Sequence, residues 1–270
     1  MNHATGPLPP GPSLCTRIAS ATHIGPVRSV NEDATTISPR LVAVADGMGG
    51  HGGGDVAAAI VTRHLFNSSA ELWHTAEEIT RVLEASAAEI RRLQSERSAP
   101  GTTIVAACAT VQSGLPAWLI VSIGDSRAYI FSGGALRQVT HDHSQIQEML
   151  DAGLLSPEQA AVSPYRNVIT NALGAGITNV QPDFFLIPAR PGDRLLLTSD
   201  GAHGVLAPEH LAELVAAGDT PQVVADSILL AALTGGTQDN ATVAVLEVLS
   251  ASPAWPDTDA PDPNTLSRVS

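Results

Sequence analysis

Apolar residues follow two different spacings along the chain, and the two spacings predict two kinds of element. Short apolar runs bounded by Gly, Pro, Asp or Asn are typical of strands. Such runs occupy residues 16–23, 41–45, 102–111, 117–123, 127–131, 184–187, 194–198 and 242–249. Amphipathic helical spacing occupies residues 55–66, 76–96, 144–152, 157–161, 208–216 and 221–233.

The links between the predicted strands indicate how the strands pair. Gly133 and Gly134 join two neighbouring runs, and Ser113 and Gly114 join two others. Links this short are typical of hairpins, which join antiparallel strands. Because the strands come in runs with the helices grouped around them, the pattern predicts antiparallel sheets covered by helices, an α+β fold.

The two ends of the chain differ in composition from the segment between them. We expect residues 1–14 to be a flexible, Gly/Pro-rich N-terminus and residues 250–270 to be a disordered tail rich in Pro and Asp. The intervening residues 15–249 are predicted to form one domain. The longest apolar runs, 104–111 and 117–123, are far shorter than the roughly 18 residues of a membrane span, so no membrane contact is expected.

The charge of the chain narrows the classes of partner. Of its 270 residues, 27 are acidic and 14 are basic, and the net charge is −13. An excess of negative charge argues against binding to nucleic acid, because such binding neutralises phosphates with basic side chains, and it favours binding of cations. All of the basic residues are Arg, which excludes a Schiff-base lysine and the lysine of a P-loop. With two cysteines, Cys15 and Cys108, a Cys-rich zinc site is excluded and a reducing cytoplasm is the expected location.

Four aspartates lie at the ends of predicted strands. Asp46 and Asp200 each follow an apolar run and precede a Gly, Asp125 comes just after residues 118–124, and Asp239 comes just before residues 241–248. Singly, each is explained as a turn residue. Together, carboxylates at strand ends can converge on one cleft, where their repulsion requires a hard cation between them. The Gly after Asp46 lets its own carbonyl approach such an ion.

A second acidic group follows an arginine near the N-terminus. Arg28 precedes the adjacent pair Glu32 and Asp33 by four and five residues. Arg28 can simply pair with Glu32 on a solvated face. Alternatively, Glu32 and Asp33 contribute to a metal site while the guanidinium of Arg28 grips an anionic ligand.

Other catalytic motifs are weaker. Residues 47–52 match the Gly-x-Gly-x-x-Gly dinucleotide pattern, but the next segment reads as a long helix where that fold needs a second strand. No Gly-x-Ser-x-Gly elbow and no His-Glu-x-x-His helix occurs in the sequence.

Eight short motifs, taken in order, resemble the metal-dependent protein phosphatases of the 2C family in their bacterial serine/threonine form. They are Arg28…Asn31-Glu32-Asp33, Asp46-Gly47-Met48-Gly49-Gly50-His51, Gly101-Thr102-Thr103, Gly124-Asp125-Ser126-Arg127, Asp142-His143-Ser144, Asn167-Val168-Ile169-Thr170, Ser199-Asp200-Gly201 and Asp239-Asn240-x-Thr242. The resemblance implies two packed antiparallel β-sheets flanked by α-helices, a four-layer α-β-β-α sandwich, with residues 15–249 as the catalytic domain.

The resemblance also implies a site with two tight Mg²⁺ or Mn²⁺ ions and a weaker third. Asp46 would bridge the two ions and Gly47 would offer its carbonyl. Asp200 and Asp239 would complete the shell of one ion, and Glu32 and Asp33 would hold the other. Asp125 would support the third ion together with Asp200, and Arg28 would bind the substrate phosphate. Met48 replaces the His of animal relatives, which leaves the general acid unassigned, and Asn171 replaces an Arg that many bacterial relatives carry.

The function expected from this resemblance is hydrolysis of phosphoserine and phosphothreonine in proteins by a metal-activated water, opposing a bacterial Ser/Thr kinase. A monomer is expected. Two alternatives stay open at this point: a catalytically silent scaffold that binds phosphoproteins, and a phosphatase of small phosphate esters. Retention of every expected carboxylate argues against the scaffold, whereas a metal site that reads only the phosphate does not separate protein from small-molecule substrates.

Overall fold

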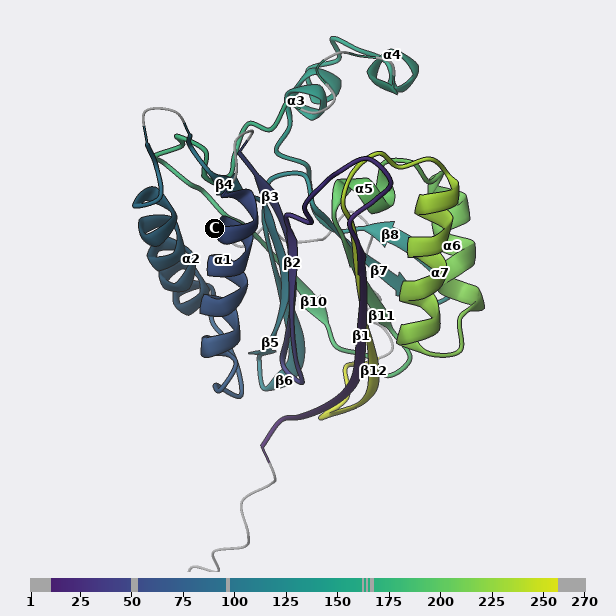
Figure 1. The fold of residues 1–270 in the computed structure, drawn as a ribbon. Coiled ribbons are helices and arrows are strands. Elements are labelled where there is room, and N and C mark those ends of the chain that lie inside the picture. The colour runs from purple at the N-terminus through teal and green to yellow at the C-terminus, as the bar shows by residue number, and fades with distance from the viewer. Residues whose placement is uncertain are drawn as a thin grey trace, which may run out of the picture.

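The computed structural model describes residues 11–49, 53–95, 98–161, 163, 165 and 168–256. Within these residues the chain forms two antiparallel sheets that pack face to face, with helices on both outer faces (Figure 1). The predicted α+β fold and its four-layer α-β-β-α arrangement are therefore confirmed. No helix among the described residues is long and apolar enough to cross a membrane.

The first sheet gathers both ends of the described chain. Among the described residues it has five strands in the order β1-β12-β11-β7-β8. Their bounds are Ser13–His23 (β1), Ala241–Ser252 (β12), Arg194–Thr198 (β11), Arg127–Ser132 (β7) and Ala135–Gln138 (β8). The Gly133-Gly134 hairpin between β7 and β8 pairs Ser132 with Ala135, as the spacing predicts.

The second sheet carries the strands from the middle of the chain. In the described part it has seven strands, in the order β10-β6-β5-β3-β4-β9 with β2 paired to β3. Their bounds are Asp183–Pro188 (β10), Leu115–Ile123 (β6), Ile104–Gln112 (β5), Leu41–Met48 (β3), Gly101–Thr102 (β4), Leu173–Gly174 (β9) and Asp33–Ser38 (β2).

The helices divide between the two outer faces. Helices α1 (Gly54–Ser68) and α2 (Ala76–Arg91) cover the seven-stranded sheet, and α6 (Pro208–Ala217) and α7 (Pro221–Thr234) cover the other. The short helix α5 (Asp200–His203) follows β11 directly. Helices α3 (Gln145–Asp151) and α4 (Pro157–Ala161) stand apart from both layers, beyond one end of the sheets (Figure 1).

Residues 41–45 of β3 are all apolar because both faces of the strand are covered there. Leu41, Ala43 and Ala45 pack under α1 and α2, whereas Val42 and Val44 join the core between the sheets. Successive side chains of a strand point to opposite faces. A strand covered on both faces therefore has no polar side, and its sequence reads as a continuous apolar run.

Several element boundaries differ from the predictions. The apolar run at residues 102–111 divides into two strands, β4 and β5. The division falls at Thr103, whose backbone N–H donates to the carbonyl of Asp46. The helix predicted over 76–96 ends at Arg91, and Ser95 then bridges to Ser98. Strand β2 was missed because its polar sequence acquires strand geometry by pairing with β3.

The domain extends beyond the predicted limits of 15 and 249 at both ends. Ser13 pairs with Ser252 and Leu14 with Ala251, so the prediction of disorder is wrong for residues 250–252. The indole N–H of Trp255 donates to the carbonyl of Pro116 on β6. Residues 1–10 and 257–270, and Gly50, His51 and Gly52 of the glycine-rich motif, lie outside the described residues.

Truncation tests how much the last residues contribute. A chain that ends at Leu249 loses the pairing of residues 250–252 and the Trp255 hydrogen bond. We expect its free energy of unfolding to fall by about 2–3 kcal/mol, because Leu14 and Ala251 also pack against the core between the sheets. A chain that ends at Pro256 is the matched control and should unfold like the full-length protein in urea. Equal stability of the two truncated chains would contradict this prediction.

Candidate metal centre

Two of the predicted carboxylates are brought together by strand register. Asp33 is the first residue of β2 and is paired directly with Asp46 near the end of β3. Residues opposite each other on antiparallel strands have their Cβ atoms roughly 5 Å apart. The pairing thus places two acidic side chains at one end of the seven-stranded sheet.

The other sheet contributes Asp200 and Asp239 at the same end. Asp200 begins α5 directly after β11, and Asp239 precedes β12. Ser199 connects the sheets, because its hydroxyl donates to Asp33 Oδ2 (2.8 Å) and accepts from the backbone N–H of Thr242 (2.9 Å). Ser199 occurs in one of the motifs quoted above, but the sequence did not reveal this bridging contact.

The backbone of Asp46 is fixed by two threonines. The N–H of Asp46 donates to Thr103 Oγ1 (3.1 Å), and Thr102 Oγ1 donates to the Asp46 carbonyl (2.9 Å). Gly47 is tightly enclosed: a Cβ there would lie 2.3 Å from the carbonyl oxygen of Gly54 and 2.6 Å from that of Glu32. A larger residue at 47 would therefore displace the strand end that carries Asp46.

Glu32 and Asp239 are linked through an asparagine that the sequence analysis did not assign. Asn240 accepts from the backbone N–H of Glu32 (2.8 Å) and donates to the carbonyls of Ile24 (2.8 Å) and Val30 (3.0 Å). The side chain of Glu32 reaches toward Gly54, since a Cβ on Gly54 would lie 2.8 Å from Glu32 Oε1. Asn240 therefore holds the 24–32 loop beside the carboxylates.

Arg28 takes a partner that neither of its sequence interpretations included. Its Nη2 lies 2.5 Å from Asp239 Oδ2, and both side chains are partly exposed (51% and 39%). The hydrogen bond to Asp239 raises the pKa of Arg28, and the charges of Asp46 and Glu32 add to the increase. The guanidinium thus lies at the solvent-facing edge of the acidic cluster.

Asp125 occupies a buried turn next to Asp200. The preceding Gly124 has φ +98°, and a Cβ there would lie 2.6 Å from Thr103 Cγ2. Thr103 Oγ1 and Ser126 Oγ share a hydrogen bond of 2.7 Å. Thr103 therefore contacts both the Asp46 backbone and the turn that carries Asp125.

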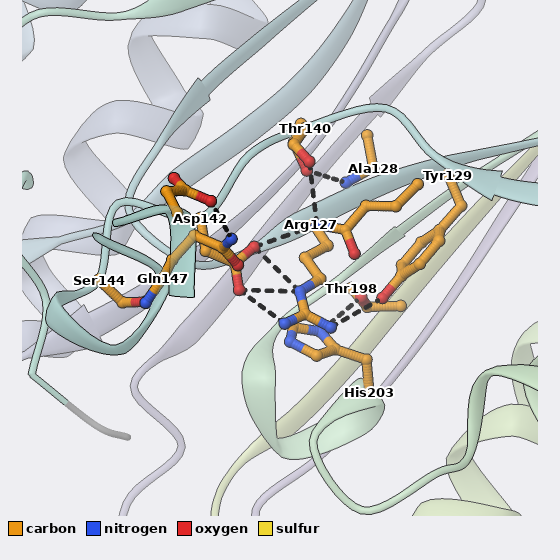
Figure 2. A network of polar contacts seen from close by, with 11 residues as sticks. Arg127, Ala128, Tyr129, Thr140, Asp142, Ser144, Gln147, Thr198 and His203 are labelled. Carbon is orange, nitrogen blue, oxygen red and sulfur yellow. Dashed lines mark hydrogen bonds and ion pairs between the residues drawn. The ribbon is translucent and has the colours of Figure 1, made fainter. Parts of the chain in front are cut away.

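A polar network surrounds Arg127, two residues after Asp125 (Figure 2). Arg127 makes a forked ion pair with Asp142, with Nε–Oδ1 at 2.9 Å and Nη2–Oδ2 at 2.6 Å. His203 lies beside this pair and accepts or donates a 2.9 Å hydrogen bond with Thr198. Burial, and then the charge of Arg127, lower the pKa of His203 well below its usual range, so this imidazole is neutral at pH 7.

Burial and mutual repulsion raise the pKa values of the clustered carboxyl groups. Burial, followed by the neighbouring carboxylates, raises the pKa of Asp46 well above its usual range. Burial raises the pKa of Asp33 to about 6, and burial with the charge of Asp200 raises that of Asp125 to about 7. The pKa of Asp200 is also raised, first by burial and then by Asp239. Ionising all four together requires a compensating positive charge.

The donor set fits a hard divalent cation. Asp33, Asp125 and Asp200 each have a buried Oδ1 that makes no hydrogen bond to any described residue. Carboxylate oxygens are the ligands that Mg²⁺ and Mn²⁺ prefer. Within the described ranges, no group of three or more His, Cys, Asp or Glu side chains is already arranged to hold a metal ion. The fit therefore rests on the free oxygens and on the electrostatics of the cluster.

Comparison with known proteins identifies the family. The family model for protein phosphatase 2C matches residues 27–225. The chain belongs to the protein phosphatase 2C family. Its resemblance to this family, expected from the eight motifs, is confirmed, and its activity is that of a protein serine/threonine phosphatase.

Named relatives support this membership over most of the chain. The serine/threonine phosphatase Stp of Listeria monocytogenes serotype 4b is 36% identical over 240 residues, covering 84% of this chain and 93% of Stp. The phosphatase PstP of Mycobacterium tuberculosis is 34% identical over 245 residues. That match covers 88% of this phosphatase but 46% of PstP, so this chain spans about half the length of PstP.

Solved structures agree with the fold. The crystal structure of M. tuberculosis PstP has a TM-score of 0.81 at 32% identity, covering 88% of this chain and 100% of that chain. A PstP catalytic domain in complex with two manganese ions has a TM-score of 0.75 at 31% identity, with the same coverage. The protein phosphatase 2C family is thus metal-dependent, which is the coarser part of the cofactor prediction.

The raised pKa values predict an unusual pH dependence for the metal-free phosphatase. A carboxyl group with a raised pKa binds its proton more tightly in the folded state than in the unfolded state. Protonation of this group therefore stabilises the fold at low pH, and this contribution to the free energy of unfolding is lost as pH rises through the folded pKa. For Asp33 and Asp125 this window runs from about 4 to about 7. We expect the free energy of unfolding in EDTA to fall by about 2–4 kcal/mol between pH 5 and pH 8.

Urea unfolding in EDTA across this pH range measures the effect. Asp125→Asn should flatten the slope, because it removes one of the titrating groups. Asp226→Asn is the matched control, since Asp226 is an exposed carboxylate on α7 that accepts from Gln222. Stability that rises with pH in EDTA would contradict the prediction.

Proposed function

We propose that this phosphatase hydrolyses phosphoserine and phosphothreonine at the acidic cluster, using two tightly bound Mg²⁺ or Mn²⁺ ions. Asp46 and the Gly47 carbonyl would bind at the centre. Asp200 and Asp239 would hold one ion and Glu32 with Asp33 the other. Asp125 and Asp200 would hold a weaker third ion. When bound, such ions would lower the pKa of a water molecule and so would supply a nucleophile for hydrolysis of the phosphate ester.

The observation that carries this proposal is the set of buried aspartates contributed by both sheets. Like charges gathered in a buried position destabilise the fold unless a cation balances them. Support comes from the raised pKa values and from the Oδ1 atoms of Asp33, Asp125 and Asp200, which have no hydrogen-bond donor among the described residues. An enzyme that merely needed turn residues at these strand ends would have no reason to bury them together.

Arg28 is proposed to bind the phosphoryl group of the substrate. A guanidinium presents parallel N–H donors that match two oxygens of a phosphate. Arg28 is half exposed beside Asp239 at the edge of the cluster, which leaves donors available to an incoming ligand. Its charge would offset the negative charge that the phosphate brings to an already acidic cleft.

The substrates and the opposing kinase are proposed from the membership of the protein phosphatase 2C family. The substrates would be proteins phosphorylated by a Ser/Thr kinase that this phosphatase opposes. The choice between Mg²⁺ and Mn²⁺, and the expected monomeric state, remain predictions.

Removing the central charge tests the metal site. Asp46→Asn should lower kcat on a phosphothreonine peptide by about a thousandfold or more, because loss of the shared ligand releases at least one ion and the nucleophile with it. Calorimetry with Mn²⁺ should show at least one tight site fewer than in the wild type. Asp226→Asn is the control and should retain both. Full turnover of the wild type in excess EDTA would refute the proposed mechanism.

Removing the guanidinium tests phosphate binding. Arg28→Ala should raise KM for the phosphopeptide about tenfold and lower kcat less, since the fork binds phosphate in both ground and transition states. Arg17→Ala is a matched control, because Arg17 also forms an ion pair but with Glu247, on the long β1–β12 ladder. If Arg28→Ala and the control have equal kinetics, Arg28 does not bind the phosphate and its ion pair with Asp239 is purely structural.

A further inference from the structure

His143 stands where three segments of the chain meet. Its backbone N–H donates to the carbonyl of Gly124 (2.9 Å), and its carbonyl accepts from the backbone N–H of Thr170 (2.9 Å). Its Nε2 lies 3.2 Å from Oδ2 of Asp183, the first residue of β10. The side chains of His143 and Asp183 are 13% and 8% exposed. His143 is thus a largely enclosed junction between these three segments.

The hydrogen bonds around the imidazole define its tautomer. Two N–H donors point at Nδ1: the backbone amide of Gly124 (3.1 Å) and Nδ2 of Asn171 (3.2 Å). The Asn171 amide is oriented by the Gln181 carbonyl, which accepts from the same Nδ2 (2.8 Å). Nδ1 must therefore carry a lone pair, and the proton sits on Nε2, where it donates to the Asp183 carboxylate.

Gly124 is held on its other side as well. A Cβ on Gly124 would lie 2.6 Å and 2.8 Å from the Thr103 side chain, so its peptide is enclosed between Thr103 and His143. Asp125 is the next residue. Because rotation of the Gly124 peptide would swing the carboxylate of Asp125, the contacts on Gly124 set the direction of that side chain.

The same loop is tied to the Asp125 turn a second time. Arg127 lies two residues after Asp125, and Asp142 lies one residue before His143. These two side chains form the forked ion pair of Figure 2. Beyond His143 the chain departs into α3 and α4 and returns at Ile169, which bridges to Ser144. The loop that carries α3 and α4 and the turn that carries Asp125 are therefore joined at both Gly124 and Arg127.

The geometry points to His143 as a positioning residue that aims Asp125 through the Nδ1 contact with the Gly124 amide. The inference rests on the role proposed above for Asp125. Asp183 holds the tautomer that makes Nδ1 an acceptor, and Asn171 supports it. The imidazole acts through the backbone, because it fixes the peptide from which a carboxylate of the site projects.

Two substitutions separate the halves of the imidazole. In His143→Asn the side-chain oxygen can take the place of Nδ1 and accept from Gly124, but nothing reaches Asp183. In His143→Gln the amide can reach Asp183, but the acceptor at Nδ1 is lost. His141→Gln is the matched control, because His141 lies two residues away, is 53% exposed and pairs with the exposed Asp151.

The first readout is nuclear magnetic resonance and needs neither substrate nor metal. In the wild type, nitrogen shifts of His143 should report the Nε2–H tautomer. Hydrogen exchange of the Gly124 amide should be about five- to tenfold faster in His143→Gln, as expected for loss of one buried hydrogen bond, and near wild type in His143→Asn. An Nδ1–H tautomer, or equal exchange in the two variants, would overturn the proposal.

The second readout is steady-state kinetics on a phosphothreonine peptide with Mn²⁺. His143→Gln should lower kcat about tenfold with KM changed less than about threefold, His143→Asn should restore kcat to within about threefold, and His141→Gln should match the wild type. Thermal melts check that both His143 variants fold. Equal losses in the two variants would overturn the proposal. An inactive wild type would refute the proposed function instead, and the exchange measurement would still decide the role of His143.

Discussion

The constraint on which this structure depends is the burial of several carboxylates at one end of a β-sandwich. Asp33, Asp46, Asp125 and Asp200 repel one another and lose hydration, and both effects raise their pKa values. A folded chain tolerates such a cluster only where the surrounding backbone is held firmly enough that the strand ends do not move apart. The packing of the two sheets in this phosphatase holds the strand ends in place.

Asp33, Asp46 and the turn that carries Asp125 are held by hydrogen bonds with neighbouring hydroxyl groups. Thr103 binds the Asp46 amide and shares a hydrogen bond with Ser126, while Ser199 bridges Asp33 on one sheet to the β12 backbone on the other. Hydroxyl groups suit this task because they donate and accept without adding charge. Because the site draws on both sheets, it exists only while the sandwich is intact.

Two interactions of different kinds hold the edge of the site: an ion pair and a hydrogen-bonded histidine. The Arg127–Asp142 pair is largely buried, so loss of either partner would leave an uncompensated charge, which is more damaging than loss of both. His143 adds a neutral hydrogen-bonded junction between the Asp125 turn, β10 and the base of the α3–α4 loop. Together they link the part of the molecule that stands outside the sandwich to the carboxylate at its edge.

The sequence by itself determined the apolar strands, most of the helices, and the occurrence of Asp46, Asp125, Asp200 and Asp239 at strand ends, because burial periodicity and turn chemistry are local properties. It did not reveal β2, whose polar residues become a strand only by pairing with β3, or the short helix α5. The partner of Arg28 was also beyond it, since Asp239 lies 211 residues away and is brought near by the packing of two sheets. The register that sets Asp33 opposite Asp46, and the enclosure of the Gly124 peptide between Thr103 and His143, were decided only by the tertiary structure. These contacts join segments that share no local pattern, and their geometry depends on how whole layers pack.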